Sequence, residues 1–311
     1  MNKLNRLGLG TMGMSIVRNP ENSVKTIHAA LDAGITLFNT GEFYNASESE
    51  LIVGQALKGV NHDKYFLSVK FGVLPSPEGG IYGLDVKPHN VKGHLTYSLR
   101  RLGLDYIDLY QPARQDTTVP VEELVSAIAE QVEAGYIKHI GLSMVDAETL
   151  RRAHAVHPIH TVEMEYSLIE RSIEKELIAT AKELGVKVLA FGTVGHGLLR
   201  DNFRDAVTDP RMGSGLLAPE NSEKNLAMIQ KVKDIADEKG VSLAWSLAKY
   251  DHVQSLIGTT NPDHLQSAIN ALQIELTDED ITRIETALPA DKICGKGMRH
   301  FLFTDGKMTL A

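Results

Sequence analysis

The sequence has almost no cysteine and no long apolar run. Cys294 is the only cysteine among 311 residues, so no intrachain disulfide can form and nothing indicates an oxidising compartment. No stretch of eighteen apolar residues occurs, and the N-terminus MNKLNRLGLG lacks the apolar segment of an export signal. We therefore expect a cytoplasmic protein without a membrane partner.

Basic residues are scarce relative to acidic ones. Lys and Arg number 32 against 40 Asp and Glu, which gives a formal net charge of −8. Nucleic-acid binding needs clustered positive charge to neutralise phosphates, and the chain has no such block. Apolar residues make up 43% of the chain, enough for a sizeable core. The composition predicts a globular protein that acts on a small molecule rather than on nucleic acid, as a monomer or weak homo-oligomer.

A metal site is not expected, although the chain has twelve histidines. The segment HAVHPIH places His154, His157 and His160 three residues apart. Pro158 ends any helix near His157, so the three rings need not share one face. We expect a helix end followed by a strand at this segment.

The segment RLGLGTMG carries the GxGxxG spacing of a Rossmann dinucleotide-binding motif. That motif requires a strand, a glycine turn and a helix in immediate succession. Here the helical pattern begins only at Pro20, with Asn19 as its cap, and so leaves a gap after Gly13. The spacing is therefore weak support for a Rossmann site.

Short apolar runs alternate with helical patterns along most of the chain. The segments DAG, EAG and ELG end helices in the way expected before a following strand. The eight predicted strands are KLNRLGLG, TLFNT, YFLSVKF, YIDLY, KHIGLS, TVEMEY, VKVLAF and VQSLIG. The eight predicted helices cover Val24 to Ala33, Ser49 to Leu57, Val91 to Leu102, Glu122 to Ala134, Ala147 to Ala155, Glu174 to Leu184, Glu223 to Lys239 and His264 to Ala271.

Eight such pairs favour a single-domain (β/α)₈ barrel, or TIM barrel, over residues 1–311. A doubly wound open sheet is the alternative, because alternation alone does not show closure. Further helices are expected at LAWSLAKY and from Asp278 to Ala287. The tail, residues 289–311, is either a frayed terminus or a loop folded over the barrel mouth.

The chemistry of such a barrel belongs at the C-terminal ends of its strands. Tyr44 follows the second strand and Lys70 ends the third. A phenol is a poor acid at neutral pH, but a neighbouring ammonium stabilises the phenolate and lowers its pKa. Tyr44 could then donate a proton to a carbonyl oxygen, although the spacing fits a solvated lysine and an ordinary loop tyrosine equally well.

The chain resembles the aldo-keto reductases over nearly its whole length. The motifs that carry the resemblance are RLGLGTMGMS, FNTGEFYN, SVKFG, LGLDYIDLY, HIGLSMV, EYSLIER, VLAFGTVGHGLL, SLAWSLA and IGTTNPDHL. The resemblance implies a (β/α)₈ barrel that binds NADPH and reduces aldehydes or ketones to alcohols, with NADH as an alternative cofactor. It also implies that GLGTMG is a strand and turn near the nicotinamide, where glycine allows close approach.

The resemblance assigns catalysis to Tyr44, Lys70 and Asn39. Asn39 stands where the family usually has an aspartate, and Ala113 stands where it has a histidine. Because Asn39 is neutral, we expect more of the Lys70 field to act on Tyr44 and to give it a lower pKa than in relatives that have the aspartate. Ala113 cannot orient a carbonyl, so a water, Arg114 or the substrate itself has to replace that contact.

The resemblance also implies a set of cofactor-binding residues. Glu163 replaces the family's glutamine, and we expect it either to favour the oxidised nicotinamide or to pair with a basic residue such as Arg114. Only His264 is potentially basic at the adenosine end, which leaves the preference for a 2′-phosphate open. The implied set is Gly10, Thr11, Met12, Asn39, Ser143, Met144, Glu163, Phe191, Gly192, Thr193, Gly197, Leu198, Gly258, Thr259, Thr260 and His264.

Two narrower hypotheses concern the function. The segments NTGEFY and DLYQPAR are similar to those of the pyridoxal reductases, which predicts pyridoxal as substrate and pyridoxine as product. The missing aspartate and histidine instead favour a slow sensor or regulatory subunit that binds the cofactor on the same fold. A hydrolase is not expected, because no paired carboxylates or metal ligands gather at the strand ends.

Overall fold

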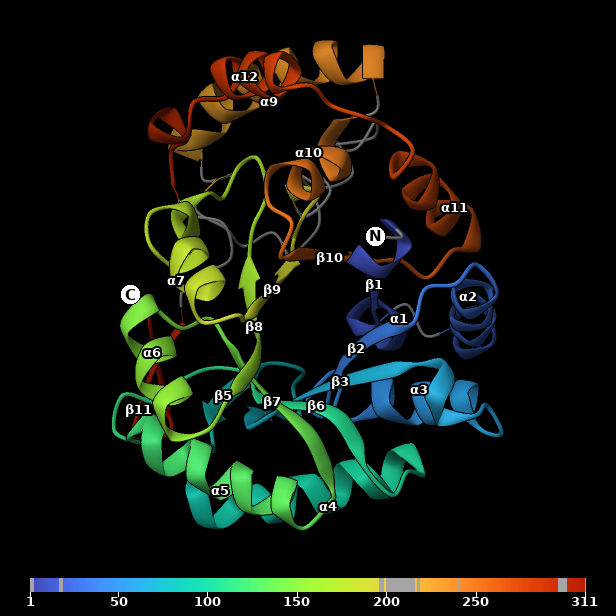
Figure 1. Cartoon of the computed structure of the whole chain (residues 1–311), viewed down its shortest axis with the longest axis vertical. Coiled ribbons are helices and arrows are strands. Elements are labelled where there is room, and N and C mark those ends of the chain that lie inside the picture. Colours follow the sequence, from blue (N-terminus) through green and yellow to red (C-terminus); the bar gives the residue numbers. More distant parts are fainter. Residues whose placement is uncertain are drawn as a thin grey trace.

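Eight parallel strands form a closed barrel with helices around its outside (Figure 1). The computed structural model describes residues 3–16, 19–195, 199, 216, 219–239, 241–295 and 301–310. The barrel strands are β1 (Leu7–Gly10), β2 (Leu37–Gly41), β3 (Phe66–Phe71), β6 (Ile107–Pro112), β7 (Ile137–Ser143), β8 (Ile159–Glu165), β9 (Lys187–Phe191) and β10 (Val253–Gly258). The order β1-β2-β3-β6-β7-β8-β9-β10 closes by parallel pairing of β10 with β1. The predicted TIM barrel is confirmed, and the open-sheet alternative is wrong.

The helices follow the predicted positions within a few residues in most cases. They are α1 (Met12–Ile16), α2 (Pro20–Asp32), α3 (Glu48–Leu57), α4 (Val91–Leu102), α5 (Val121–Glu133), α6 (Ala147–Val156), α7 (Leu177–Glu183), α9 (Pro219–Lys239), α10 (Val241–Lys249), α11 (Pro262–Ala271) and α12 (Asp278–Ala287). The cap of α2 forms as its sequence indicates, because the Asn19 side chain accepts a hydrogen bond from the Asn22 backbone N–H and Pro20 opens the helix. Gly34, which follows α2, has a φ of 88°, a conformation that suits glycine.

Several predicted boundaries are wrong. Residues Lys3–Arg6 form a short 3₁₀ helix, so the first strand is shorter than KLNRLGLG. The helix α1 begins two residues after β1 ends, where no helix was expected before Pro20. The segment from Glu174 to Leu184 is divided between the 3₁₀ helix Ser172–Glu174 and α7. Short helices of this kind carry too few residues to give a periodic pattern.

Gly8 shows what the first glycine of GLGTMG does. A Cβ on Gly8 would lie 2.7 Å from Leu37 Cδ2 and 2.8 Å from Leu256 Cδ2. Leu37, Leu256 and Leu189 form a small apolar cluster of their own. Glycine at this position therefore permits close packing between neighbouring barrel strands.

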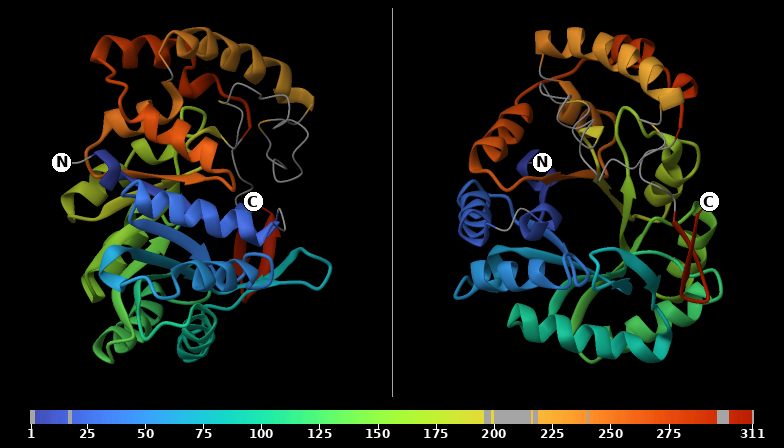
Figure 2. Two further views of the ribbon diagram at one scale, coloured as in Figure 1. Left: turned by 90° about the vertical axis from the view of Figure 1, so that its right-hand side faces the viewer. Right: turned by 180° about the vertical axis from the view of Figure 1, so that it is seen from behind.

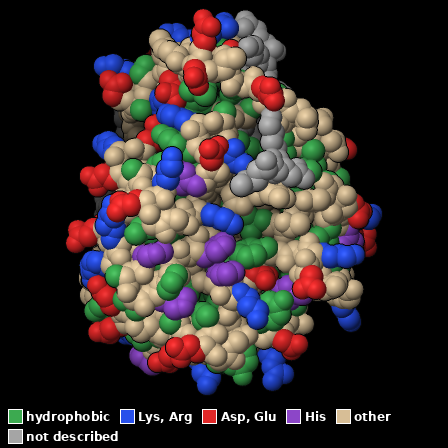
Figure 3. Space-filling view, viewed as in Figure 1, with side chains coloured by type: hydrophobic (Ala, Val, Ile, Leu, Met, Phe, Trp, Pro, Cys, Tyr) green, Lys and Arg blue, Asp and Glu red, His purple; other side chains and the backbone are tan. Residues whose placement is uncertain are grey.

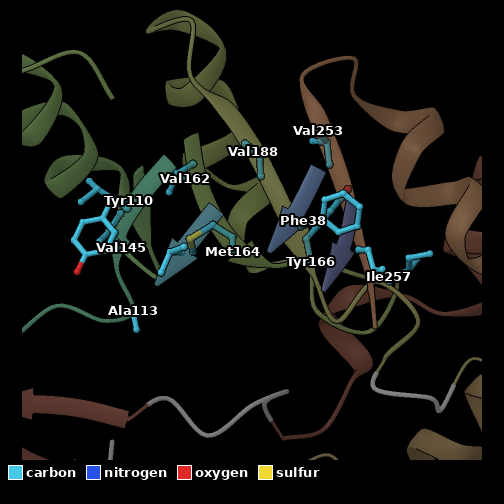
Figure 4. Close-up of a cluster of buried hydrophobic side chains, with 14 of the residues drawn as sticks. Phe38, Tyr110, Ala113, Val145, Val162, Met164, Tyr166, Val188, Val253 and Ile257 are labelled. Carbon is cyan, nitrogen blue, oxygen red and sulfur yellow. The ribbon is translucent and has the colours of Figure 1, made fainter. Parts of the chain in front are cut away.

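The main core lies between the barrel and the surrounding helices (Figure 4). Side chains alternate along each strand, so Phe38 on β2 and Val162 on β8 belong to this core while their neighbours Asn39 and Glu163 have the opposite orientation. The same alternation in β3 sets Val69 apart from Lys70. Apolar side chains consequently face the helices, and polar side chains gather inside the barrel.

The C-terminal residues form a second, antiparallel sheet with a hairpin that follows β3 (Figure 2). Strand β11 (Phe301–Thr304) pairs with β12 (Lys307–Leu310), and β12 pairs with β5 (Ile81–Leu84), which itself pairs with β4 (Val73–Pro75). The Asp116 carboxylate accepts hydrogen bonds from the backbone N–H groups of Asp305 (3.1 Å) and Gly306 (2.6 Å). Residues 301–310 are thus attached to the loop that follows β6.

Several histidine side chains gather on one face of the molecule (Figure 3). His139 near the start of β7 stacks on His160 near the start of β8, with ring centroids 4.4 Å apart. Within the part of the chain that the structure describes, no group of three or more His, Cys, Asp or Glu side chains is arranged to hold a metal ion. Nor is any of the described helices long and apolar enough to cross a membrane.

Candidate active site

Five polar side chains meet inside the barrel. They come from four strands: Asn39 from β2, Ser68 and Lys70 from β3, Gln111 from β6 and Glu163 from β8. The strand register pairs Asn39 with Ser68 and Lys70 with Gln111, which sets these side chains at neighbouring levels. Period-two alternation and barrel closure together bring them into contact.

Glu163 lies at the centre of this group. Its Oε1 accepts a hydrogen bond from Lys70 Nζ at 2.7 Å, and its Oε2 accepts from Asn39 Nδ2 at 2.7 Å and from Gln111 Nε2 at 2.6 Å. Lys70 Nζ also donates to Asn39 Oδ1 at 2.5 Å. Lys70, Asn39 and Glu163, which we call the inner cluster, are each at most 3% exposed. Burying an ion pair in this way requires that its polar atoms find partners, and they do.

Tyr44 lies above the inner cluster and is still partly exposed. Lys70 Nζ lies 5.3 Å from the centroid of its ring. The three residues after it, Asn45, Ala46 and Ser47, all have positive φ angles although none is glycine. Such backbone persists only where the surroundings hold it, and here Ser47 Oγ donates to the Glu42 carbonyl at 2.7 Å. The loop therefore presents Tyr44 at the mouth of the barrel in one defined conformation.

The titration of Tyr44 and Lys70 is coupled. Burial raises the pKa of the Tyr44 phenol, the charge and hydrogen bond of Lys70 oppose this, and Glu163 raises it further. Burial alone would lower the pKa of Lys70, but Glu163 and Tyr44 outweigh it and raise that pKa. At neutral pH the phenol is protonated and the amine is charged, which is the state from which Tyr44 can donate a proton.

We expected the pKa of Tyr44 to be lower than in relatives with an aspartate at position 39, because Asn39 brings no negative charge to Lys70. The premise that Lys70 lacks a carboxylate partner is wrong, because Glu163 brings one to it from β8. Partial burial raises the pKa of Tyr44 against the opposing charge of Lys70, and Glu163 raises it further, so the comparison with those relatives stays a prediction. Glu163 does pair with a basic residue, but that residue is Lys70 and not Arg114.

A second ionic group, which we call the outer cluster, lies on the other side of the Tyr44 loop and consists of Glu42, Glu50, His94 and Arg101. Glu42 Oε1 accepts a hydrogen bond from the Gly72 backbone N–H (2.7 Å) and lies 2.8 Å from His94 Nδ1. Arg101 Nε bonds to the fully buried Glu50, and its Nη2 lies 3.8 Å from Glu42. Because Glu42 precedes Tyr44 by two residues, this cluster ties the catalytic loop to the end of β3 and to α4.

Ala113 and Arg114 follow β6 at the barrel mouth. Ala113 is fully buried and offers no side-chain hydrogen bond. Arg114 Nη1 donates to the Ala113 carbonyl at 2.6 Å, and no salt bridge within 4.0 Å links Arg114 to any carboxylate of the described residues. Burial lowers the pKa of Arg114, and the charges of Tyr44, Glu163 and Glu165 oppose that shift. A guanidinium near Tyr44 is thus available to an oxyanion.

Most of the implied cofactor residues that the structure describes lie at or just after the C-terminal ends of barrel strands, but several of their hydroxyls are already engaged. Thr11 Oγ1 lies 2.8 Å from Ser49 Oγ, and Thr193 Oγ1 donates to the Leu256 carbonyl at 3.3 Å. Thr259 Oγ1 bonds within its own turn to Asn261, and the Thr260 carbonyl accepts from the Asn22 side chain. The hydroxyls of Thr11, Thr193 and Thr259 therefore have partners within the protein, whereas Thr260 is engaged through its backbone carbonyl.

The remaining implied positions differ in exposure. Gly10 and Gly258 end β1 and β10 as a register pair, Met12 is 42% exposed, and His264 is exposed on α11. Phe191 ends β9 and packs against the apolar cluster of Leu37, Leu189 and Leu256, followed by Gly192 with a φ of 67°. Gly197 and Leu198 lie outside the described residues.

Ser143 and Met144 give a test of whether a nicotinamide fits. Ser143 ends β7 beside Glu163 in the register, and its buried Oγ has no hydrogen-bond partner among the described residues. Met144 has a φ of 52°, and its backbone N–H donates to the Glu163 carbonyl. A buried hydroxyl without a partner costs free energy, and a carboxamide can both donate to it and accept from it. These residues fit the nicotinamide end of the cofactor.

Sequence reasoning missed Ser68 and Gln111. Ser68 Oγ accepts from both Asn39 Nδ2 (3.1 Å) and Gln111 Nε2 (3.2 Å). The available signal was their parity, because each is a polar residue at an inward position of an apolar strand. Neither residue type suggests catalysis by itself.

Comparison with known proteins agrees with this geometry. The sequence model of the Aldo/keto reductase family matches residues 6–289. A probable aldo-keto reductase 1 from Glycine max is 34% identical, over 96% of this chain and 91% of that protein. The glycerol dehydrogenase of Gluconobacter oxydans is 30% identical with a TM-score of 0.79 over 91% of each chain. An aldo-keto reductase from Bacillus halodurans in its holo form is 25% identical with a TM-score of 0.76 over 92% of each chain.

The family match and the geometry of the barrel lead to the same conclusion. The relatives are named as reductases and dehydrogenases, and the family uses nicotinamide cofactors. The chain belongs to the Aldo/keto reductase family and is an NAD(P)H-dependent oxidoreductase.

Proposed function

We propose that this protein uses NADPH to reduce a small aldehyde or ketone to the alcohol, with Tyr44 as the general acid. The observation that carries the proposal is the buried Lys70 ammonium, 5.3 Å from the centroid of the partly exposed Tyr44 ring. A cation in this position stabilises the phenolate that forms as the proton leaves. It therefore acts most strongly in the transition state, where catalysis needs it.

The proton is handled by residues of this chain. Tyr44 donates its hydroxyl proton to the carbonyl oxygen, Lys70 stabilises the resulting phenolate, and Asn39 and Glu163 keep Lys70 in place. The reduced nicotinamide supplies the hydride when it is bound. Ser143 would hold its carboxamide and Phe191 would contact its ring, with Gly258, Thr259, Thr260 and His264 toward the adenosine end. NADH is the alternative cofactor, because His264 alone brings potential positive charge there.

For the substrate, we propose an aldehyde that carries an oxyanion, and pyridoxal is the specific candidate. Arg114 supports this proposal, because it is partly buried near Tyr44 and makes no salt bridge within 4.0 Å among the described residues. The oxygen on the ring of a hydroxypyridine could accept from its guanidinium. That contact would compensate for Ala113, which cannot orient the substrate itself.

The C-terminal residues form part of this proposal. We propose that residues 289–311 fold over one side of the barrel mouth. Asp116, which holds the turn at Asp305 and Gly306, is two residues from Arg114, and Phe303 beside it is 1% exposed. The hairpin would then limit the size of the aldehyde that reaches Tyr44.

The test is NADPH consumption with pyridoxal, benzaldehyde and glycerol-derived aldehydes, repeated with NADH. Tyr44→Phe should lower kcat/KM by about 10²- to 10⁴-fold, because the variant has no proton to donate. Tyr97→Phe is the matched control, since Tyr97 is 66% exposed on α4. Tight cofactor binding without turnover of any carbonyl would contradict the proposal and favour the sensor hypothesis.

A further inference from the structure

The inner cluster contains one carboxylate, and it comes from an unexpected strand. Glu163 of β8 is the carboxylate within 4.0 Å of Lys70 Nζ, while Asn39 of β2 supplies an amide to both partners. In the family pattern described above, the carboxylate belongs at the position of Asn39 and the amide at that of Glu163. The two groups have exchanged strands, yet both remain in contact with the lysine.

We propose that Glu163 is the positioning residue of the catalytic lysine, with Asn39 and Gln111 orienting its carboxylate toward Lys70. This inference rests on the proposed roles of Tyr44 and Lys70. Glu163 makes its contact with the ammonium and acts on Tyr44 through it.

The hydrogen-bond pattern supports this assignment. Glu163 accepts three hydrogen bonds: one on Oε1 from Lys70 and two on Oε2 from Asn39 and Gln111. A carboxylate only accepts, and an amide N–H only donates, so the arrangement assigns each group without ambiguity. Asn39 is bidentate in effect, because its Oδ1 accepts from Lys70 while its Nδ2 donates to Glu163. If residue 39 alone becomes a carboxylate, it can still accept from Lys70, but its donor to Glu163 is lost.

The charges around Tyr44 explain why this carboxylate matters. Among the described residues, the titratable or charged groups that act on Tyr44 are Lys70 from β3, Glu163 from β8 and Arg114 after β6. Glu165, two residues beyond Glu163, acts on Arg114 instead. Glu163 is thus the anion that offsets two cations at the phenol. Removing it makes the first loss of a proton from the coupled Lys70 and Tyr44 pair easier, whichever group gives the proton up.

Glu163→Gln tests the proposal through the pH profile of carbonyl reduction at saturating NADPH, with benzaldehyde as substrate. Reduction requires both a protonated Tyr44 and a charged Lys70, so the rate falls on the alkaline side as this pair loses its first proton. The variant should lose activity about 1 to 3 pH units lower than the wild type, because Glu163 lies within hydrogen-bond distance of Lys70 and a charge that close shifts the pKa of the coupled Lys70 and Tyr44 pair by that order. Tyrosinate absorbance of the cofactor-free protein, read as the difference from Tyr44→Phe, should shift in the same direction.

The double variant Asn39→Asp/Glu163→Gln gives the decisive comparison. The double variant places a carboxylate beside Lys70 from β2 and an amide from β8. The pH at which activity is lost on the alkaline side should therefore return toward that of the wild type. Asn39→Asp alone places two carboxylates against each other, and should be a poorer enzyme than the double variant. Glu165→Gln is the matched control, because it removes a carboxylate from the same strand without touching Lys70.

The outcomes separate the two proposals. If the wild type turns over, Tyr44→Phe is inactive, and Glu163→Gln keeps the wild-type limb, then Glu163 is only structural and this inference is wrong. A loss of kcat in Glu163→Gln that the double variant does not repair would contradict it equally. If Tyr44→Phe remains fully active, the proposed function itself fails, and with it any role for Glu163 through Tyr44.

Discussion

The inner and outer clusters lie on opposite sides of β2 and β3, and they bury their charge in different ways. In the inner cluster, Lys70 and Glu163 balance each other, and each contact that Glu163 accepts comes from a matched donor. The outer cluster holds two carboxylates, and the Oε1 of Glu50 has no partner among the described residues. It reaches charge balance only when Arg101 is joined by a protonated His94.

This difference indicates that the inner cluster takes part in the reaction and that the outer cluster stabilises the structure around it. The inner cluster lies next to Tyr44 at the barrel mouth, so a change of charge on Tyr44 during the reaction interacts directly with Lys70. The outer cluster is enclosed between the barrel, α3 and α4, and its contact with the reaction is mechanical, through Glu42 and the loop of Tyr44. We expect damage to the inner cluster to appear in kcat/KM and damage to the outer cluster to appear in stability.

The largest expected effect is that of Arg101→Met in the outer cluster. The substitution leaves the buried Glu50 carboxylate without its counter-ion, so the free energy of unfolding should fall by about 3 kcal/mol. Burial, opposed by Arg101, already raises the pKa of Glu50, and losing Arg101 raises it further, so the loss should shrink at acidic pH. Urea unfolding at two pH values measures this.

Arg100→Met is the matched control for that measurement. Arg100 is the neighbouring arginine on α4 and is exposed, so its substitution should leave the unfolding midpoint close to that of the wild type. Equal losses in the two variants would mean that the outer cluster does not stabilise the fold. A large drop in kcat/KM for folded Arg101→Met would remove the distinction between the clusters.

Lys70→Met should have the next largest effect, and should show it in activity. Without the ammonium, the phenolate of Tyr44 loses the cation that acts on it most strongly and keeps only the weaker field of Arg114, so kcat/KM should fall at least about 100-fold, or about 2.7 kcal/mol. Steady-state reduction of benzaldehyde measures this, with NADPH affinity from fluorescence as the control for folding. Retained kcat/KM would show that the inner cluster is structural.

His94→Gln should have the smallest effect, and one that depends on pH. Burial lowers the pKa of His94, but the hydrogen bond and charge of Glu42, aided by Asp85 and opposed by Arg101, raise it overall. Its contribution is therefore fully present below the unfolded pKa of about 6.5 and is lost as the pH rises through the raised folded pKa. The variant should lose about 1.5 kcal/mol at mildly acidic pH, as for a hydrogen bond to a charged group.

Urea unfolding of wild type and His94→Gln, below and above the pH range over which His94 titrates, checks the direction of this pH dependence. His89→Gln serves as control because His89 is exposed. A loss that grows toward alkaline pH would show that His94 binds Glu42 as the neutral ring, and the outer cluster would then carry a net negative charge.

Much of the fold could be predicted because local patterns are strong in a barrel. The β10 strand and the α4 helix have the predicted bounds, and α2 begins at the predicted cap. The hairpin of β4 and β5 was missed, as was its pairing with residues 301–310, because strands of three or four residues show little periodicity. In addition, β5 and its partner β12 are more than two hundred residues apart in sequence.

The candidate site was predicted unevenly for a related reason. Tyr44 and Lys70 carry distinctive chemistry at strand ends, and the structure brings them together. The partner of Glu163 could not be predicted, since β8 and β3 are not adjacent in the barrel and meet only across its interior. The premise behind the expected effect of Asn39 failed for the same reason, because it considered one neighbour of Lys70 and left out Glu163.

The sequence by itself determined the alternation of strands and helices, the inward parity of Asn39, Lys70 and Glu163, and the family. Periodicity and turn residues are local properties, and each strand carries its own. Only the tertiary structure decided which carboxylate neutralises Lys70 and in which direction the pKa of Tyr44 moves. Those depend on burial and on charges from β3, from β8 and from the loop after β6, and electrostatic interactions act through space after the barrel has closed.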